Sequence, residues 1–140
     1  MIEQITVFLE NDRGRLAAMC RTLGNEGISM HLLTVADTEH YGVARIICDY
    51  PKKACFALNE AGYRAKITQV CAVAIPDRAG GLATLFETLD TENINVEYAY
   101  CCSASGDEAI DVFRIDDERV SNILTGAGFK LLAPEDVYLT

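Results

Sequence analysis

Two short loops hold the residue types best suited to bind a small charged molecule. Their sequences are Asn11-Asp12-Arg13-Gly14-Arg15-Leu16 and Asp77-Arg78-Ala79-Gly80-Gly81-Leu82. In each loop a polar side chain stands three residues before a glycine, and a leucine follows that glycine by two residues. The glycine lets the backbone approach another group closely, and the N–H groups at the start of a following helix favour an anion. A carboxylate that approaches either loop would find backbone donors in place.

The same residues also have a purely structural interpretation. The side-chain oxygen of Asn11 or Asp77 is of the kind that caps the first turn of a helix, and the glycines then only make the turn. Each loop, taken singly, is a common pattern. From the residues alone, a binding site and a pair of helix caps remain equally open.

The chain offers little material for catalysis or metal binding. Its six cysteines form no CxxC pair, and neither histidine lies near a pair of cysteines, so the spacing of a zinc site is absent. We find no Ser/His/Asp set, phosphate-binding loop or cofactor fingerprint. His31 follows Ser29 by two residues, so it shares a strand face with Ser29 and can join a pocket there. We expect no catalytic residue, no metal and no cofactor.

The cysteines are interpreted as reduced thiols. Most of them stand among Ala, Val, Ile and Leu, where a thiol behaves as a small hydrophobic group. The adjacent pair Cys101-Cys102 is different, because one of two neighbours on a strand must face outward.

Composition and charge narrow the class of protein. Half of the 140 residues are hydrophobic and 24% are charged, as in globular proteins. No apolar run approaches the ~20 residues that span a bilayer, and Met1-Ile2-Glu3-Gln4 does not resemble a signal peptide, so we expect a cytoplasmic protein. The net charge of −9 comes from residues 67–140, which hold four Lys or Arg and thirteen Asp or Glu. Such a chain repels phosphate backbones, and we expect neither a nucleic acid nor a membrane as partner.

The chain contains an internal repeat. When it is shifted against itself by 66 residues, the two halves superpose without a gap, and identities recur at apolar and glycine positions. The identical pairs include Val7 and Val73, Gly14 and Gly80, Leu16 and Leu82, Leu23 and Leu89, Ile28 and Ile94, Leu58 and Leu124, and Gly62 and Gly128. The same fold is therefore expected twice, in domains 1–68 and 69–140.

Hydrophobic periodicity gives each repeat the order βαββαβ. In the first repeat we predict strands over 4–9, 28–36, 43–48 and 64–68, with helices over 16–23 and 51–61. In the second repeat we predict strands over 70–75, 94–102, 109–115 and 137–139, with helices over 82–91 and 117–125. The loops Asn11–Leu16 and Asp77–Leu82 then lie between the first strand and first helix of each repeat.

This order predicts the fold class and the assembly. It corresponds to α+β, with two ferredoxin-like βαββαβ modules in which each antiparallel sheet carries its helices on one face. The other sheet face and the edge strands need cover, so a homodimer is expected.

Each repeat resembles an ACT domain, the βαββαβ module that binds amino acids and regulates amino-acid metabolism. The resemblance covers nearly the whole chain twice. Asp77-Arg78-Ala79-Gly80-Gly81-Leu82 is close to the family's D-R-P-G-x-L loop, and Glu92-Asn93-Ile94-Asn95-Val96 opens the second strand as the family does. In the first repeat, Asn11–Leu16 and Glu26–Met30 stand at the same places. Arg13 and Ala79 replace the family's proline, and Ser29 stands where the second repeat has Asn95.

The resemblance implies a free amino acid as ligand. In ACT domains the ligand lies between two modules, where the loop before the first helix of one module meets the second strand of another. The residues carried over are Asn11, Gly14 and Leu16 with Ser29, and Asp77, Gly80 and Leu82 with Asn95. The backbone after each glycine would hold the α-carboxylate, and Asn11 or Asp77 would accept from the α-ammonium. Because the second repeat is acidic, a neutral or basic amino acid is favoured over Asp or Glu.

Three hypotheses for the function remain open. The leading hypothesis is a free-standing pair of ACT-like modules that senses an amino acid and regulates a separate enzyme or its own assembly. The second is a structural or adaptor protein whose loops bind no ligand. The third is a small ferredoxin-like enzyme, which the missing acid, base and nucleophile disfavour.

Overall fold

A computed structural model describes residues 1–103 and 106–140, which group into two compact units. The N-terminal unit consists of Glu3–Thr68 with Pro134–Thr140, and the C-terminal unit consists of Gln69–Ala133 with Met1–Ile2. The chain passes from the N-terminal unit to the C-terminal unit between residues 68 and 69. The chain ends, by contrast, each group with the unit built mainly from the other repeat.

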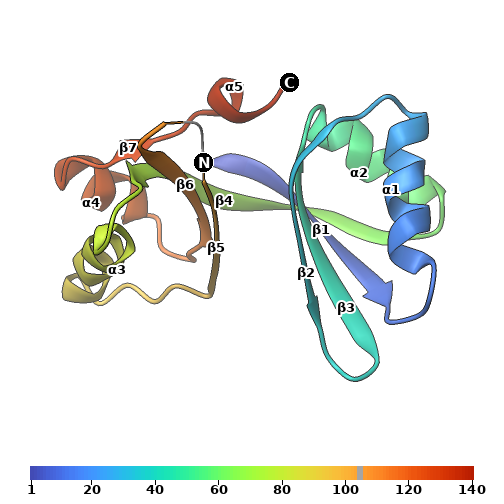
Figure 1. The fold of residues 1–140 in the computed structure, drawn as a ribbon, viewed down its shortest axis with the longest axis horizontal. Coiled ribbons are helices and arrows are strands. Elements are labelled where there is room, and N and C mark those ends of the chain that lie inside the picture. The colour runs from blue at the N-terminus through green and yellow to red at the C-terminus, as the bar shows by residue number, and fades with distance from the viewer. Residues whose placement is uncertain (104–105) are drawn as a thin grey trace. The chain divides into compact units, whose positions relative to one another are not determined.

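The N-terminal unit contains the first repeat. Its elements are β1 (Ile2–Glu10), α1 (Arg15–Asn25), β2 (Met30–Asp37), β3 (Tyr41–Cys48), α2 (Pro51–Glu60), the first part of β4 (Arg64–Pro76) and the short α5 (Pro134–Val137). Its strands lie in the order β2-β3-β1-β4, and β3 is antiparallel to both of its neighbours. Figure 1 shows these elements in chain order.

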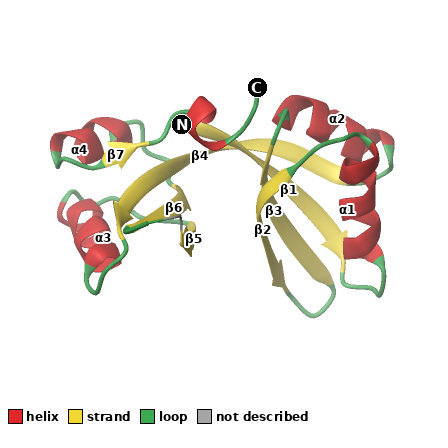
Figure 2. Cartoon of the chain, turned by 45° about the horizontal axis from the view of Figure 1, so that its top comes forward, coloured by secondary structure: helices red, strands yellow, loops and turns green. Residues whose placement is uncertain are grey.

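The C-terminal unit repeats this arrangement. The second part of β4 serves as its first strand, followed by α3 (Gly81–Thr91), β5 (Tyr98–Ser103), β6 (Glu108–Arg114), α4 (Val120–Gly126) and β7 (Lys130–Leu131). The strand order is β7-β4-β6-β5, and each neighbouring pair is antiparallel. In each unit the two long helices cover one face of the sheet (Figure 2). The prediction of two ferredoxin-like βαββαβ modules is confirmed.

The last strand of the second repeat is not where the sequence analysis placed it. A strand was predicted over 137–139, but β7 lies at Lys130–Leu131, where Leu131 pairs with Val73. The spacing of the first repeat explains this, because Gly62 precedes β4 by two residues as Gly128 precedes β7. Pro134 then begins a short helix, a position that favours proline. Tyr138 belongs to the N-terminal unit, where its hydroxyl accepts a hydrogen bond from the Glu3 N–H at 2.8 Å.

The repeat also carries one shift in register. Val7 lies opposite Ala44, whereas its counterpart Val73 lies opposite Asp111, one residue later than a shift of 66 predicts. The segment between β5 and β6 is one residue longer than the segment between β2 and β3. As a consequence Asp111 takes the place that Ala44 holds in the first repeat.

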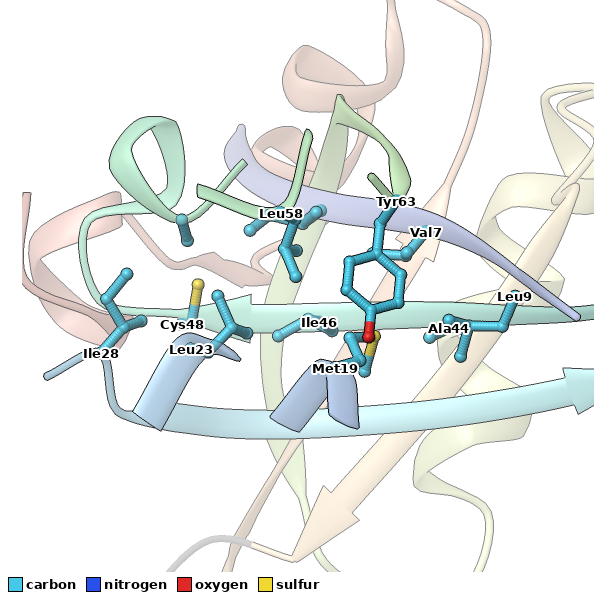
Figure 3. Close-up of a cluster of buried hydrophobic side chains, with 12 residues drawn as sticks. Val7, Leu9, Met19, Leu23, Ile28, Ala44, Ile46, Cys48, Leu58 and Tyr63 are labelled. Carbon is cyan, nitrogen blue, oxygen red and sulfur yellow. The ribbon is translucent and has the colours of Figure 1, made fainter. Parts of the chain in front are cut away.

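Each unit has a hydrophobic core between its sheet and its helices. In the N-terminal unit, Met19 and Leu23 of α1 pack with Ile46 and Tyr63 (Figure 3). In the C-terminal unit, Leu85 and Leu89 of α3 pack over Val73 and Phe113. None of the helices in the described residues is long and apolar enough to cross a membrane.

Candidate functional site

A cavity of about 210 Å³ lies at the second loop, in the C-terminal unit. Its lining comes from the end of β4, the loop, the first turn of α3, and the strands β5 and β6. The lining residues are Ile75, Pro76, Asp77, Arg78, Gly80, Leu82, Ala83, Cys101 and Ala109. Four of the residues predicted as ligand contacts, Asp77, Arg78, Gly80 and Leu82, are thus brought to one cavity.

Backbone hydrogen bonds fix the shape of this loop. The Asp77 N–H donates to the Asp107 carbonyl at 2.7 Å, and the Gly81 N–H donates to the Arg78 carbonyl at 3.1 Å. Gly80 has a φ of 85°, a left-handed conformation that glycine adopts without steric cost. A Cβ on Gly81 would lie 2.6 Å from the Pro76 carbonyl oxygen. Gly80 is therefore required for a left-handed turn, and Gly81 is required for a close backbone contact.

The helix caps are not the ones that the sequence suggested. The N-cap residues are Gly14 for α1 and Gly80 for α3, and neither helix has a side-chain cap. Asn11 and Asp77 lie three residues before these caps, so the interpretation of their side chains as N-caps is wrong. The first-turn N–H groups of α3, such as that of Leu82, have no acceptor within the helix, as helix geometry requires.

The leucines of the two loops are also more exposed than expected. The helical spacing of Leu16 with Met19 and Leu23, and of Leu82 with Leu85 and Leu89, predicts buried leucines. Yet 40% of the surface of Leu16 and 39% of the surface of Leu82 are accessible. The buried face of α3 runs through Leu85 and Leu89, one helical turn apart. Leu82 lies beside that face and lines the cavity instead.

The surroundings of the cavity are acidic. Burial raises the pKa of the Cys101 thiol, and the carboxylates of Asp111 and Asp77 raise it further. Asp111 lies directly across the strand pair from Cys101 and is only 1% exposed. Burial raises the pKa of the Asp111 carboxyl to about 6. The resulting potential favours a cation over a second anion on this wall.

The first loop has a similar backbone turn, with a φ of 88° at Gly14, but it presents different side chains. Asn11, Asp12, Arg13 and Gly14 are exposed, and the Asn11 N–H donates to the His40 carbonyl at 3.3 Å. Arg15 stands where the second repeat has Gly81, and its guanidinium lies 5.1 Å from the centre of the Tyr63 ring. The two loops are therefore related by sequence but present different groups.

The two predicted contacts from the second strands do not line the cavity. Ser29 and Asn95 are exposed, and they lie before the first residues of β2 and β5. The Ser29 carbonyl accepts a hydrogen bond from the Asp49 N–H at 3.0 Å. Their role as ligand contacts stays a prediction.

His31 belongs to a different cluster. Its Nε2 lies 2.7 Å from Asp49 Oδ1, and the Leu139 N–H donates to the same oxygen at 2.8 Å. These two hydrogen bonds hold the pKa of Asp49 below its usual value. The cluster fastens the C-terminal segment to the start of α2, and His31 does not take part in the cavity.

Sequence reasoning missed the apolar wall of the cavity and the acid behind it. Ile75, Cys101 and Ala109 line the cavity, and Asp111 lies across from Cys101. Strand alternation carries a signal for Asp111, because Ala109, Asp111 and Phe113 share one face. A carboxylate between two apolar side chains on a core face marks an unusual position.

No three His, Cys, Asp or Glu side chains within residues 1–103 and 106–140 gather as a metal site would require. The six cysteines are free thiols, and Cys48 and Cys71 are buried. Burial raises the pKa of Cys48 to about 12, so this thiol stays protonated at neutral pH.

Comparison with known proteins identifies the family. The model of the ACT domain pair matches residues 1–138. The chain therefore belongs to this family of regulatory amino-acid-binding domains. No match was found among curated proteins.

Solved structures agree with this assignment. Protein BT0572 from Bacteroides thetaiotaomicron is 30% identical with a TM-score of 0.92, over 96% of this chain and 94% of that chain. The ligand-free regulatory subunit of aspartate kinase from Thermus thermophilus is 18% identical with a TM-score of 0.67, over 90% of each chain. The corresponding subunit from Thermus flavus is 19% identical with a TM-score of 0.65, also over 90% of each chain. The likeness to the two kinase subunits shows a shared fold.

Proposed function

We propose that the chain senses a free α-amino acid, which binds in the cavity at the second loop. The observation that supports this is the convergence of Asp77, Gly80 and Leu82 on one cavity at the start of α3. In this arrangement the first-turn backbone N–H groups receive the α-carboxylate. The Asp77 carboxylate lines the same cavity and accepts from the α-ammonium, as a charge-assisted hydrogen bond.

The volume and charge of the cavity indicate which amino acids fit. About 210 Å³ is below the roughly 300–1,000 Å³ of pockets for drug-sized ligands and suits a single amino acid. A side-chain carboxylate on the ligand would meet the field of Asp77 and Asp111, with no cationic group other than Arg78 in the lining. A neutral or basic amino acid is therefore the favoured ligand.

Regulation by this chain acts on another molecule or on its own assembly. The family is regulatory, and we propose that the chain has no catalytic activity of its own. A separate enzyme is then the regulated target, or the ligand changes the oligomeric state. In an oligomer, Ser29 and Asn95 contact the ligand from the second strand of a partner module. The chain functions in the cytoplasm.

An adaptor that uses the same fold only for assembly is the second candidate. Exposed apolar side chains support it, because Leu33 and Val35 on the edge strand β2 are 39% and 45% accessible. Such a protein binds partners through these side chains and gains no stability from amino acids.

Thermal unfolding in the presence of each of the twenty amino acids separates the two candidates. A ligand at 100 times its Kd stabilises the folded state by about 2.7 kcal/mol, which raises the melting temperature by several degrees. We expect one or a few neutral or basic amino acids to do so. If none does at millimolar concentration, the adaptor replaces the sensor.

Calorimetry on Asp77→Ala then tests the site. Loss of a charge-assisted contact weakens binding of the best amino acid about ten- to a hundredfold. Asp90→Ala is the matched control, because Asp90 is an exposed aspartate on the same helix α3 and does not line the cavity. Equal affinities for the two variants, with both folded, would place the ligand elsewhere.

A further inference from the structure

The N-terminal unit holds a second cavity, of about 450 Å³, that the amino-acid site does not use. It is lined by Phe8, Glu10, Arg15, Tyr41, Gly62, Tyr63 and Arg64. These residues come from the end of β1, the first residues of α1, β3 and β4, and the turn between α2 and β4. Its volume lies within the roughly 300–1,000 Å³ that is typical of small-molecule pockets.

Two guanidinium groups at this cavity are held against aromatic rings. Arg15 lies 5.1 Å from the centre of the Tyr63 ring, and Arg64 lies 5.9 Å from the centre of the Phe8 ring. Tyr63 is fixed in turn, because its ring is in the core and its N–H donates to the Leu58 carbonyl at 3.0 Å. Stacking of this kind limits the freedom of a guanidinium and leaves its N–H donors directed outward.

These guanidinium groups have no anionic partner within the described residues. Neither Arg15 nor Arg64 forms an ion pair there, and the Arg15 Nε is buried without a hydrogen-bond acceptor. A buried donor without an acceptor destabilises the folded chain. Glu10 is the one carboxylate among the seven lining residues, so the cavity is cationic in a chain of net charge −9.

We propose that this cavity binds a small organic anion that carries a planar ring. The anionic group receives N–H donors from Arg15 and Arg64, and the buried Nε of Arg15 gains the acceptor it lacks. The ring lies against the partly exposed side chains of Phe8 and Tyr41, which are 44% and 63% accessible. A nucleotide and an aryl carboxylate both present this chemistry.

The inference is independent of the amino-acid site. None of the seven lining residues belongs to the second loop or to α3. Amino-acid binding at Asp77 and anion binding at Arg64 can therefore succeed or fail separately.

Titration of the full chain with AMP, benzoate and inorganic phosphate tests the proposal. The chain has no tryptophan, and two of its six tyrosines, Tyr41 and Tyr63, line the cavity, so a change in tyrosine fluorescence can follow binding. Calorimetry gives the affinity. We expect AMP or benzoate to bind at least tenfold more tightly than phosphate. Preference for AMP assigns a nucleotide, and preference for benzoate assigns an aryl carboxylate. No binding of either at millimolar concentration, or equal binding of phosphate, would overturn the proposal.

Variants locate the binding. Arg64→Ala removes an exposed side chain and should fold normally, which its melting temperature without probe verifies. It should lower the affinity for AMP or benzoate about ten- to a hundredfold, and Arg15→Ala should lower it by at least as much. Arg64→Lys keeps the charge but loses the planar donors, so an intermediate affinity is expected. Arg21→Ala, an exposed arginine of α1 outside the cavity lining, is the control. An Arg64→Ala affinity equal to that of Arg21→Ala would contradict the assignment.

Discussion

Asp111 is an acidic side chain at a buried position where the surroundings favour an apolar one. It lies on the core face of β6 at 1% exposure, and its Oδ2 has no hydrogen-bond partner. The first repeat has Ala44 at the same place in the strand pairing. A buried carboxyl without partners is costly when ionised, so it holds its proton to a higher pH.

This burial predicts a definite dependence of stability on pH. The pKa of Asp111 rises from 3.8 to about 6 on folding, so between these values the folded chain holds a proton that the unfolded chain has released. The contribution of Asp111 to the free energy of unfolding therefore falls as pH rises from about 4 to about 6, by roughly 3 kcal/mol in all. Asp111→Asn removes this term, and the variant should gain stability relative to the parent chain across that window.

Urea unfolding at pH 4, 5, 6 and 7 measures the difference. Asp90→Asn, at an exposed position on α3, serves as the control and should show no comparable trend. A constant difference between Asp111→Asn and the parent chain over the whole range would show that the carboxyl is not desolvated.

The roles of single residues could be predicted where the residue type alone restricts the backbone conformation. The glycines of the two loops and the acid Asp77 could be picked out because few other residues serve at such a turn. Exposure of Leu16 and Leu82 could not, because it depends on how each helix is rotated over its sheet. The capping role given to Asn11 and Asp77 failed for a related reason, since left-handed Gly14 and Gly80 already hold the N-cap positions.

The second loop and α3 form one rigid connection because their backbones touch. A Cβ at Gly81 would lie 2.6 Å from the Pro76 carbonyl oxygen, a distance that real Cβ contacts essentially never show. In the first repeat Arg15 occupies the corresponding position, and its N–H donates to the Asp12 carbonyl as the Gly81 N–H donates to the Arg78 carbonyl. The close contact at Gly81 fixes the position of the loop relative to the first turn of α3.

Gly81→Ala should therefore destabilise the chain. Alanine favours a helix over glycine by about 1 kcal/mol, but the forced backbone shift costs about 1–3 kcal/mol and moves the ligand donors. Gly126→Ala is the matched control, because Gly126 is also helical and a Cβ there meets nothing within 4 Å. Urea unfolding should show a loss for Gly81→Ala and a small gain for Gly126→Ala. Equal gains would mean that the loop relaxes freely and does not position the helix start.

The order of helices and strands could be predicted from the sequence because the internal repeat supports each assignment twice. Periodicity placed the elements from β1 to α4 near their observed positions, although the strands predicted over 64–68 and 70–75 form the single strand β4. The strand predicted over 137–139 was replaced by β7 and α5. The one-residue shift at β6 could not be detected from spacing, because Ala44 and Ile110 are both apolar and align equally well. The strand register shows that Asp111 takes the place of Ala44 in the strand pairing.

Exposed apolar side chains lead us to expect that the chain assembles with itself. Leu33 and Val35 lie on the edge strand β2, and Leu16 on α1 is 40% exposed. An edge strand with accessible apolar groups is a surface that proteins normally cover. We expect light scattering at micromolar concentration to give at least twice the chain mass of 15.3 kDa.

A charge on that edge tests the dimer. Val35→Lys should shift the chain towards the monomer, because two copies would then bring lysines together in an apolar contact. His40→Lys, in the exposed turn after β2, is the control and should leave the mass unchanged. A monomer of the parent chain at micromolar concentration would contradict the expectation of a homodimer.

The family could be recognised from the sequence, whereas the ligand could not. The two glycine loops and the opening of the second strand carry the resemblance, and the match of the ACT domain pair over residues 1–138 agrees with it. We expect ligand choice to depend on the wall formed by Ile75, Cys101 and Ala109, which are brought together only by folding.

Amide chemical-shift mapping during titration with the best amino acid tests the sensor most directly. The account predicts that the largest changes fall on residues 77–83 and on Cys101 and Ala109, and that Asp77→Ala removes them at the same ligand concentration. Changes confined to other residues, or unaltered by Asp77→Ala in a folded chain, would contradict binding at the second loop.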